Sequence, residues 1–349
     1  MGSFISISEA APTTVPKRRF RFGGILRFTI LLAVAFCSML GAWRYVRKLS
    51  PEVELYTFAA HKKIAYAREL DKAGLPKIVI YGGSSCAFGV NTDQMRGEFH
   101  LQAVNFGLHA GMGPVVLTGL ALKYTNPGDT LIVSLEPILL NMSFDWPALG
   151  DQISYALKAP DLCEGGPLRI QRRGAFGVFL TLRPGAENIL RFLPSQLRHQ
   201  YVEYPRSTFS PSGWQRYDVH AEPKARGVGT VISADSQMLL KRLKKYCLEH
   251  SIRVAYAMPW LYCDGSRLST YKETFARFLY EMNKLIPVLR DPTLGTDTDP
   301  NDFADGPLHL RPPAATRRAE QLAKLIIEWR TWQPKELAKY FEPSRSDPE

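Results

Sequence analysis

Residues 77–91 read KIVIYGGSSCAFGVN, and this stretch decides the predicted fold. Its IVIY run is short, apolar and rich in β-branched residues, which is typical of a buried strand. Two glycines end the run and two serines follow. The pattern therefore predicts a tight turn that carries a hydroxyl group at the carboxyl edge of a sheet. A simpler interpretation also fits these residues, in which Ser84 or Ser85 only caps the next helix.

The rest of the chain alternates between predicted strands and helices. Further strands are predicted at residues 101–104, 130–135, 254–258 and 286–289, and helices at residues 50–74, 92–97, 115–124, 234–250, 270–285 and 314–329. This alternation predicts a parallel sheet that helices cover on both faces. We therefore expect an α/β fold with three layers, α/β/α, around a central, mainly parallel sheet. Residues 138–232 break the rhythm, and we expect them to form an irregular insertion over one edge of the sheet, with one helix at residues 186–197.

Candidate site residues follow each predicted strand. In chain order they are Ser84, Gly107 with Gly111, Glu136, Trp260, and Asp305 with His309. In an open parallel sheet these positions meet at the carboxyl edge, where such folds bind ligands. A serine, a histidine and an acid at one edge are the parts of a nucleophilic triad. His309 alone is more often an ordinary loop histidine, but the joint pattern favours a site.

At these residues the chain resembles the SGNH (GDSL-like) hydrolase superfamily. Residues 78–84, IVIYGGS, resemble the first sequence block of that family, residues 104–111, VNFGLHAG, the second, and residues 305–309, DGPLH, the last. The resemblance implies a flavodoxin-like sheet of the SGNH type. It covers residues 75–137 and 234–330.

Two short motifs narrow the resemblance. GSS at residues 83–85 and FGVN at residues 88–91 look most like the membrane-anchored SGNH-like proteins of bacterial exopolysaccharide O-acetylation. This implies an esterase or O-acyltransferase that acts on an acetyl ester of a cell-envelope or exported polysaccharide. Other polysaccharide biosynthesis proteins are the partners that the resemblance implies.

The resemblance also assigns roles to residues. Ser84 is the expected nucleophile, His309 the base and Asp305 the acid that orients it. The backbone N–H groups of Ser84 and Gly111 are expected to hold the oxyanion. This chemistry requires no cofactor and no metal ion.

The chain departs from the family pattern at two places. Glu136 stands near the place of a family asparagine whose amide faces the oxyanion, and Asn141 is the substitute that we consider. The acid lies four residues before His309 instead of three. The remaining candidates for the site are Ser85, Gly107, Asn105, Glu136 and, as the reserve acid, Asp302. The departures keep open a second function, a catalytically inactive SGNH-like protein that binds glycan or acts as a scaffold in a polysaccharide export complex.

The N-terminal region has a basic cluster followed by an apolar run. Residues 1–24 form the expected cytoplasmic tail, and residues 25–46 a transmembrane anchor in the lipid bilayer. A cleaved signal peptide is the competing interpretation. Because the basic cluster precedes the apolar run, we expect a single-pass protein with its N-terminus in the cytoplasm and its main domain on the other side of the membrane. The resemblance implies that this membrane is the bacterial inner membrane and that the main domain is periplasmic. The expected order then continues with a helical linker at 47–76, the α/β domain at 77–330 and a tail at 331–349.

Composition and charge limit which partners and sites we expect. The chain of 349 residues has a formal net charge of +11, but outside the N-terminal cluster its basic residues are scattered. We therefore expect no nucleic-acid partner. The five cysteines show no CxxC spacing that would indicate a metal site. Outside the apolar run they form either one disulfide or only buried thiols.

Overall fold

The computed structural model describes residues 22–48, 51–142, 148–170, 204–219, 222–225, 229 and 231–331. Contacts divide the chain into two units, residues 1–41 and 42–349, and each unit is described by itself.

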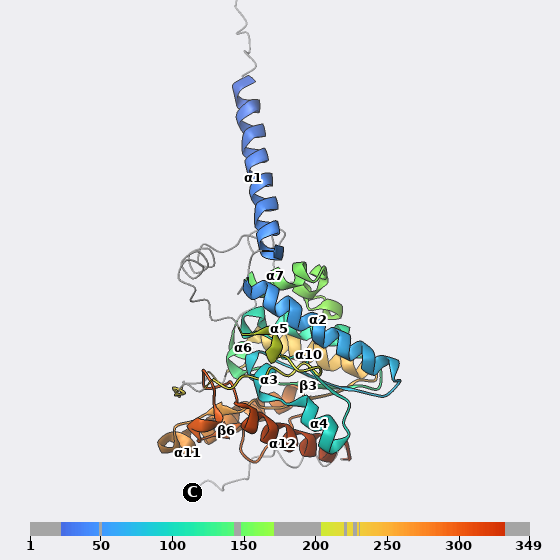
Figure 1. The fold of residues 1–349 in the computed structure, drawn as a ribbon, viewed down its shortest axis with the longest axis vertical. Helices are drawn as coiled ribbons and strands as arrows, with labels where there is room; N and C mark the ends of the chain where they lie inside the picture. The colour runs from blue at the N-terminus through green and yellow to red at the C-terminus, as the bar shows by residue number, and fades with distance from the viewer. Residues whose placement is uncertain are drawn as a thin grey trace, which may run out of the picture. The chain divides into compact units, whose positions relative to one another are not determined.

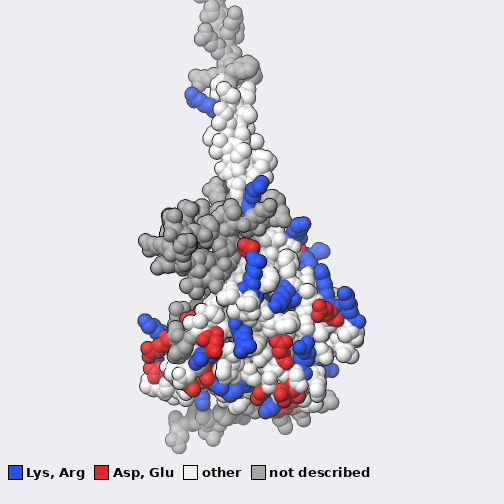
Figure 2. Space-filling view, viewed as in Figure 1, with Lys and Arg blue, Asp and Glu red and all other residues white. Residues whose placement is uncertain are grey.

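The first unit contains most of helix α1 (Phe22–Lys48). Its Gly23–Gly41 segment is long and apolar enough to cross a membrane. Figure 2 shows an uncharged surface along most of this helix, with basic side chains only toward its ends. A membrane anchor and a signal sequence share these features. The predicted anchor at residues 25–46 lies within α1.

Four parallel strands form the main sheet of the second unit. They are β1 (Ile78–Tyr81), β2 (Ala103–Asn105), β3 (Thr130–Val133) and β4 (Arg253–Tyr256). Their order in the sheet is β2-β1-β3-β4. The chain moves from β1 to β2 on one side and then crosses to β3 on the other. The strand order therefore reverses at β1, which is where ligands bind in open sheets of this kind.

Helices cover both faces of this sheet, so the prediction of an α/β fold around a parallel sheet is confirmed. One face packs on α2 (Pro51–Lys72), α5 (Gly113–Lys123), α10 (Ala234–Glu249) and α11 (Leu268–Leu285), and the other on α3 (Ser84–Gly89), α4 (Thr92–Phe99) and α12 (Pro312–Thr331). Figure 1 shows α2, α5 and α10 above the sheet and α4 and α12 below it. Val79 and Tyr81 of β1 point into the first core, whereas Ile78 and Ile80 point into the second.

The surface of the second unit carries both signs of charge. On the face shown in Figure 2, Lys and Arg gather near the end of α2, and lower on the domain they mix with Asp and Glu. The five cysteines are all free, and Cys86, Cys247 and Cys263 are buried, so the buried-thiol interpretation describes these three.

The predicted fifth strand at residues 286–289 is reduced to a single parallel bridge between Val288 and Tyr256. Pro287 precedes this bridge and has no N–H group to donate to a strand ladder, which limits the pairing. The bridge still continues the sheet beyond β4 in the parallel sense.

The region that we expected to be irregular begins with helices. Residues 137–142 and 148–168 include α6 (Pro137–Asn141), α7 (Ala148–Ala156), η2 (Pro160–Glu164) and η3 (Gly166–Leu168). Helix α7 contacts α2 and α5, and η3 contacts α5 and α10. These elements thus extend a helical layer. The predicted helix at residues 186–197 lies outside the described residues.

Residues 204–219, which include η4 (Arg206–Thr208), lie beside the β2 edge of the sheet. The backbone N–H of Asn105 donates to the carbonyl of Ser212 at 2.9 Å. Lys63 is fully buried, and its ammonium group donates to the carbonyl oxygens of Asn105, at 2.8 Å, and Gly213. The segment is therefore held against the strand whose end leads toward the site.

A second, two-stranded sheet lies next to the C-terminal loops. It pairs β5 (Leu261–Tyr262) with β6 (Thr296–Asp297) in parallel. An antiparallel bridge between Phe303 and Leu310 closes the following loop. The N–H of Tyr262 donates to the carbonyl of Pro307 in that loop at 2.8 Å. The loop with the predicted acid and histidine is thereby fixed beside β5.

Candidate functional site

The turn after β1 places Ser84 at the carboxyl edge of the sheet, as the first residue of α3. Gly82 and Gly83, which precede Ser84, lie so close to neighbouring atoms that a larger residue does not fit at either position. A Cβ atom at Gly82 would lie 2.1 Å from the carbonyl oxygen of Ser134, and one at Gly83 would lie 2.5 Å from the carboxylate oxygens of Glu136. Because neither position has room for a side chain, the glycines let this turn pack against the end of β3.

His309 and Asp305 face each other within the loop that the Phe303–Leu310 bridge closes. The Nδ1 atom of His309 lies 2.6 Å from Oδ1 of Asp305. The imidazole ring also stacks on Phe88, with 4.4 Å between ring centroids. Because Nδ1 is engaged by the carboxylate, Nε2 is the nitrogen that remains for proton transfer.

Tyr204 completes the environment of the acid. Its hydroxyl group donates to Oδ2 of Asp305 at 2.6 Å, so each carboxylate oxygen has its own donor. Burial acts to raise the pKa of Asp305, but hydrogen bonds from His309 and Tyr204 hold that pKa below its usual range. Burial, together with the bond to Asp305, raises the pKa of Tyr204. The acid therefore stays charged next to a phenol that stays protonated.

A cavity of about 370 Å³ brings the predicted triad together. Ser84, Asp305 and His309 all line it, and Glu136 is the fourth ionisable or hydroxyl-bearing residue of its wall. The remaining wall is apolar, apart from one glycine. It is formed by Ala110, Pro137, Ile138, Met258, Pro259, Leu261, Gly306, Pro307 and Leu308. The cavity is therefore a mainly apolar pocket with four polar residues in its wall.

Of the two adjacent serines, only Ser84 lines the cavity. Ser85 is 3% exposed, and its hydroxyl group is buried without a hydrogen-bond partner. Among the described residues, no hydrogen bond joins Ser84 to His309, although both line the same cavity. Hydrogen bonds of a catalytic site often tighten only when substrate binds.

Glu136 is buried against the turn that carries the serines. The N–H of Gly83 donates to its Oε2 at 3.0 Å, and the N–H of Ser85 donates to its Oε1 at 2.9 Å. The side chain is therefore an anchor for the turn. The N–H of Ser84 lies between these two donors, at a helix start where no intrahelical acceptor exists. It is one backbone donor that an oxyanion can use.

The backbone N–H of Gly111, which we expected to hold the oxyanion, donates to another acceptor. Its N–H donates to Nδ1 of His109 at 3.0 Å, and Gly111 does not line the cavity. Burial lowers the pKa of His109, which is consistent with an unprotonated Nδ1 that accepts this bond. The preceding residue, Ala110, lines the cavity instead. In residues 104–111, the residue that lines the cavity is therefore Ala110, one position before the predicted Gly111.

Asn105 and Gly107 act as structural supports. The Asn105 side chain donates to the carbonyls of Cys86 and Val90, each at 2.8 Å, and accepts the N–H of Gly107 at 2.7 Å. A Cβ atom at Gly107 would lie 2.2 Å from the backbone nitrogen of Ala87. Both residues therefore hold α3 against the end of β2, and neither lines the cavity.

The two reserve candidates lie elsewhere. The carboxylate of Asp302 is paired with Arg317 rather than with His309. Asn141, at the end of α6, is exposed and does not line the cavity. The structure thus does not place Asn141 where it would take the role of the asparagine in the SGNH sequence pattern.

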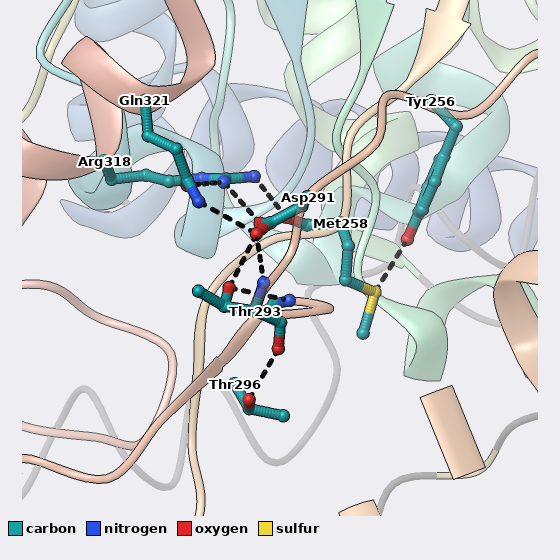
Figure 3. A network of polar contacts seen from close by, with 8 residues as sticks. Tyr256, Met258, Asp291, Thr293, Thr296, Arg318 and Gln321 are labelled. Carbon is teal, nitrogen blue, oxygen red and sulfur yellow. Dashed lines mark hydrogen bonds and ion pairs between the residues drawn. The ribbon is translucent and has the colours of Figure 1, made fainter. Parts of the chain in front are cut away.

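A buried polar network supports one wall of the cavity (Figure 3). Arg318 pairs with Asp291 at 2.6 Å and donates to the carbonyl of Met258 at 2.5 Å. Asp291 also accepts from Gln321 at 2.9 Å and from the Thr293 hydroxyl at 2.7 Å. Because the ion pair is buried and held by several hydrogen bonds, it fixes the backbone at Met258, where the chain enters the cavity wall.

Sequence reasoning missed Tyr204 and the apolar wall. The signal available for Tyr204 was the density of aromatic residues between positions 204 and 217.

Within the described part of the chain, no group of three or more His, Cys, Asp or Glu side chains is arranged to hold a metal ion. A scan against protein-family models finds no match, and neither do searches of curated proteins and of solved structures.

Proposed function

We propose that this protein is a serine esterase or O-acyltransferase of the SGNH type. One observation carries the proposal: Ser84, His309 and Asp305 line the same cavity at the carboxyl edge of the sheet, with the acid and the histidine 2.6 Å apart. The strand order β2-β1-β3-β4 adds support because flavodoxin-like sheets have this order.

The residues divide the reaction between them. His309 accepts the proton of the Ser84 hydroxyl while Oγ attacks the ester carbonyl carbon. Asp305 stabilises the charged imidazole. When the C–O bond to the leaving alcohol breaks, His309 returns the proton to that alcohol and leaves an acyl-serine. Water as the second acceptor gives an esterase, and a sugar hydroxyl gives an O-acyltransferase.

The oxyanion site of this proposal rests on the N–H of Ser84. The Gly111 N–H is engaged by His109, and the place expected for an asparagine belongs to Glu136. Loss of one oxyanion donor typically lowers the rate by about 10²–10³. We therefore expect slow turnover of activated esters.

Hydrolysis of p-nitrophenyl acetate by the full chain in detergent, compared with Ser84→Ala, tests the proposal. Equal rates for the two proteins would refute it.

For location, we propose a single-pass anchor at α1 with the main domain in the periplasm and a glycan of the cell envelope as acceptor. The basic cluster before the apolar segment supports this orientation. A C-terminal alkaline-phosphatase fusion should be active in cells and a C-terminal fluorescent fusion dark. The opposite pattern would place the domain in the cytoplasm.

A second function is supported by the Glu136 anchor. A buried carboxylate bonded to the serine turn disfavours negative charge developing beside it. The alternative is a catalytically inactive protein that binds glycan or acts as a scaffold in a polysaccharide export complex. It predicts no ester turnover together with retained binding at the cavity.

A further inference from the structure

We propose that the cavity takes the acyl part of an ester whose acyl group is uncharged, apolar and longer than acetyl. This inference rests on the proposed function, because it names the substrate class of the same site. It also changes the acetyl group that the sequence resemblance implies.

The first support is the chemistry of the wall. Apart from its four polar residues, the wall of the cavity offers mainly carbon surface. Three of its residues are prolines: Pro137, Pro259 and Pro307. Prolines donate no backbone N–H group, so this wall is poor in donors for sugar hydroxyls. A pocket of about 370 Å³ with such a wall suits alkyl carbon better than a polyhydroxylated ring.

The second support is an exposed apolar side chain in the cavity wall. Ile138 in α6 lines the cavity, yet 55% of its surface is exposed. Met258 and Leu261 form the buried part of the same wall. An acyl chain lying against Ile138 would remove apolar surface from water, which favours binding of each added methylene.

The third support is charge. Glu136 and Asp305 line the cavity, and none of the described lining residues is Lys or Arg. An acyl group that ends in a carboxylate would meet two acids, with no Lys or Arg in the wall to offset its desolvation. The cavity therefore discriminates against anionic acyl groups of the same length.

The wall is also fixed before substrate arrives. The Arg318–Asp291 pair holds the carbonyl of Met258, and the Tyr256 hydroxyl donates to the carbonyl of Leu135 at 2.9 Å (Figure 3 shows Tyr256 beside Met258). A fixed wall keeps the volume available for the acyl chain and avoids an ordering cost on binding.

The test compares three esters with the full chain in detergent: p-nitrophenyl acetate, p-nitrophenyl butyrate and mono-p-nitrophenyl succinate. Each rate is divided by the uncatalysed rate of the same ester. We expect kcat/KM for butyrate to exceed that for acetate by about 15-fold if both added methylenes are buried. Succinate, which matches butyrate in backbone length, should fall below butyrate by at least about 10-fold. Equal values for acetate and butyrate, or for butyrate and succinate, would overturn the inference.

A matched pair of variants ties the preference to this cavity. Ile138→Ser should lower the butyrate-to-acetate ratio by about 4-fold, the contribution of one buried methylene. Ile327→Ser, which changes an exposed isoleucine of α12 that does not line the cavity, should leave the ratio unchanged. An unchanged ratio in Ile138→Ser would also count against the proposed wall.

A binding measurement separates this inference from the proposed chemistry. N-butylbutanamide is an uncharged amide analogue that resists hydrolysis, and N-butylsuccinamate is its anionic counterpart. The methyl NMR signal of Met258, assigned by Met258→Leu, should shift with the first ligand and not with the second. A shift without ester turnover would refute the esterase proposal and keep the cavity assignment. Ester turnover without the chain-length preference would keep the esterase proposal and refute the assignment of the cavity to a longer acyl group.

Discussion

Replacement of Tyr204 by Phe isolates one hydrogen bond of the acid. The change removes the hydroxyl that donates to Asp305 Oδ2 at 2.6 Å and keeps the ring, which packs on Phe88 with 5.2 Å between centroids. A hydrogen bond to a charged group contributes about 1.5–3 kcal/mol. The Asp305 side chain is 30% exposed, so water screens the bond. We therefore expect a loss of about 1 kcal/mol in the free energy of unfolding at neutral pH.

The pH dependence of this loss has a definite sign. The pKa of Asp305 in the folded protein is lowered, although burial opposes the lowering, because His309 and Tyr204 donate to the charged carboxylate. The stability that comes with a lowered carboxyl pKa is present above the unfolded-state pKa and is lost as the pH falls through the folded-state pKa. The difference between wild type and Tyr204→Phe should therefore be largest at neutral pH and shrink in acid.

Urea unfolding at several pH values measures this difference, with Tyr217→Phe as the control. Tyr217 packs on Tyr204 with 4.8 Å between ring centroids, but among the described residues its hydroxyl makes no hydrogen bond to Asp305. If the bond also orients the acid during catalysis, labelling of the serine should slow by about 5-fold in Tyr204→Phe. A loss of stability that does not depend on pH, or that Tyr217→Phe shares, would refute a role for the hydroxyl in holding the charged acid.

Three further changes test the structure around the site. Glu136→Gln should lower the free energy of unfolding by about 1–3 kcal/mol in urea, because one of two buried backbone N–H groups loses its acceptor oxygen; an unchanged value would contradict the anchor. Arg318→Leu should cost about 3–5 kcal/mol, because it leaves the buried Asp291 carboxylate without its cation, and a cost no greater than that of an exposed ion pair would argue against the network. Burial lowers the pKa of Lys63 to about 7, so the unfolded state binds more protons above that pH and stability should rise from neutral to mildly alkaline pH; Lys63→Met should remove this rise, and a rise that persists would contradict the assignment.

The sheet and most helices were predictable because their signals are local. The apolar run of β1 and the glycines after it report on neighbouring residues, and the strand and turn occur where the pattern places them. The alternation of strands and helices also predicted that Ser84, Asp305 and His309 share one edge, and all three line the cavity. No local pattern contradicts these placements.

The missing parts of the site depend on distant contacts. Tyr204 lies 101 residues from Asp305 in the chain, and Glu136 lies more than 50 residues from the turn it anchors. Such contacts leave no periodic pattern in a single sequence. Gly111 was predicted as an oxyanion donor, but its N–H donates to the neighbouring side chain of His109, and only the folded turn shows this contact.

We propose that Ser84 is a nucleophile and that His309 activates it. The most direct measurement is covalent labelling of the full chain by a fluorophosphonate probe, with the modified residue located by peptide mass spectrometry. We expect a single adduct on Ser84 that is absent in Ser84→Ala, strongly reduced in His309→Ala and retained in Ser85→Ala. An adduct on Ser85, or no adduct on any serine of a protein that is folded and binds the amide analogue, would contradict it.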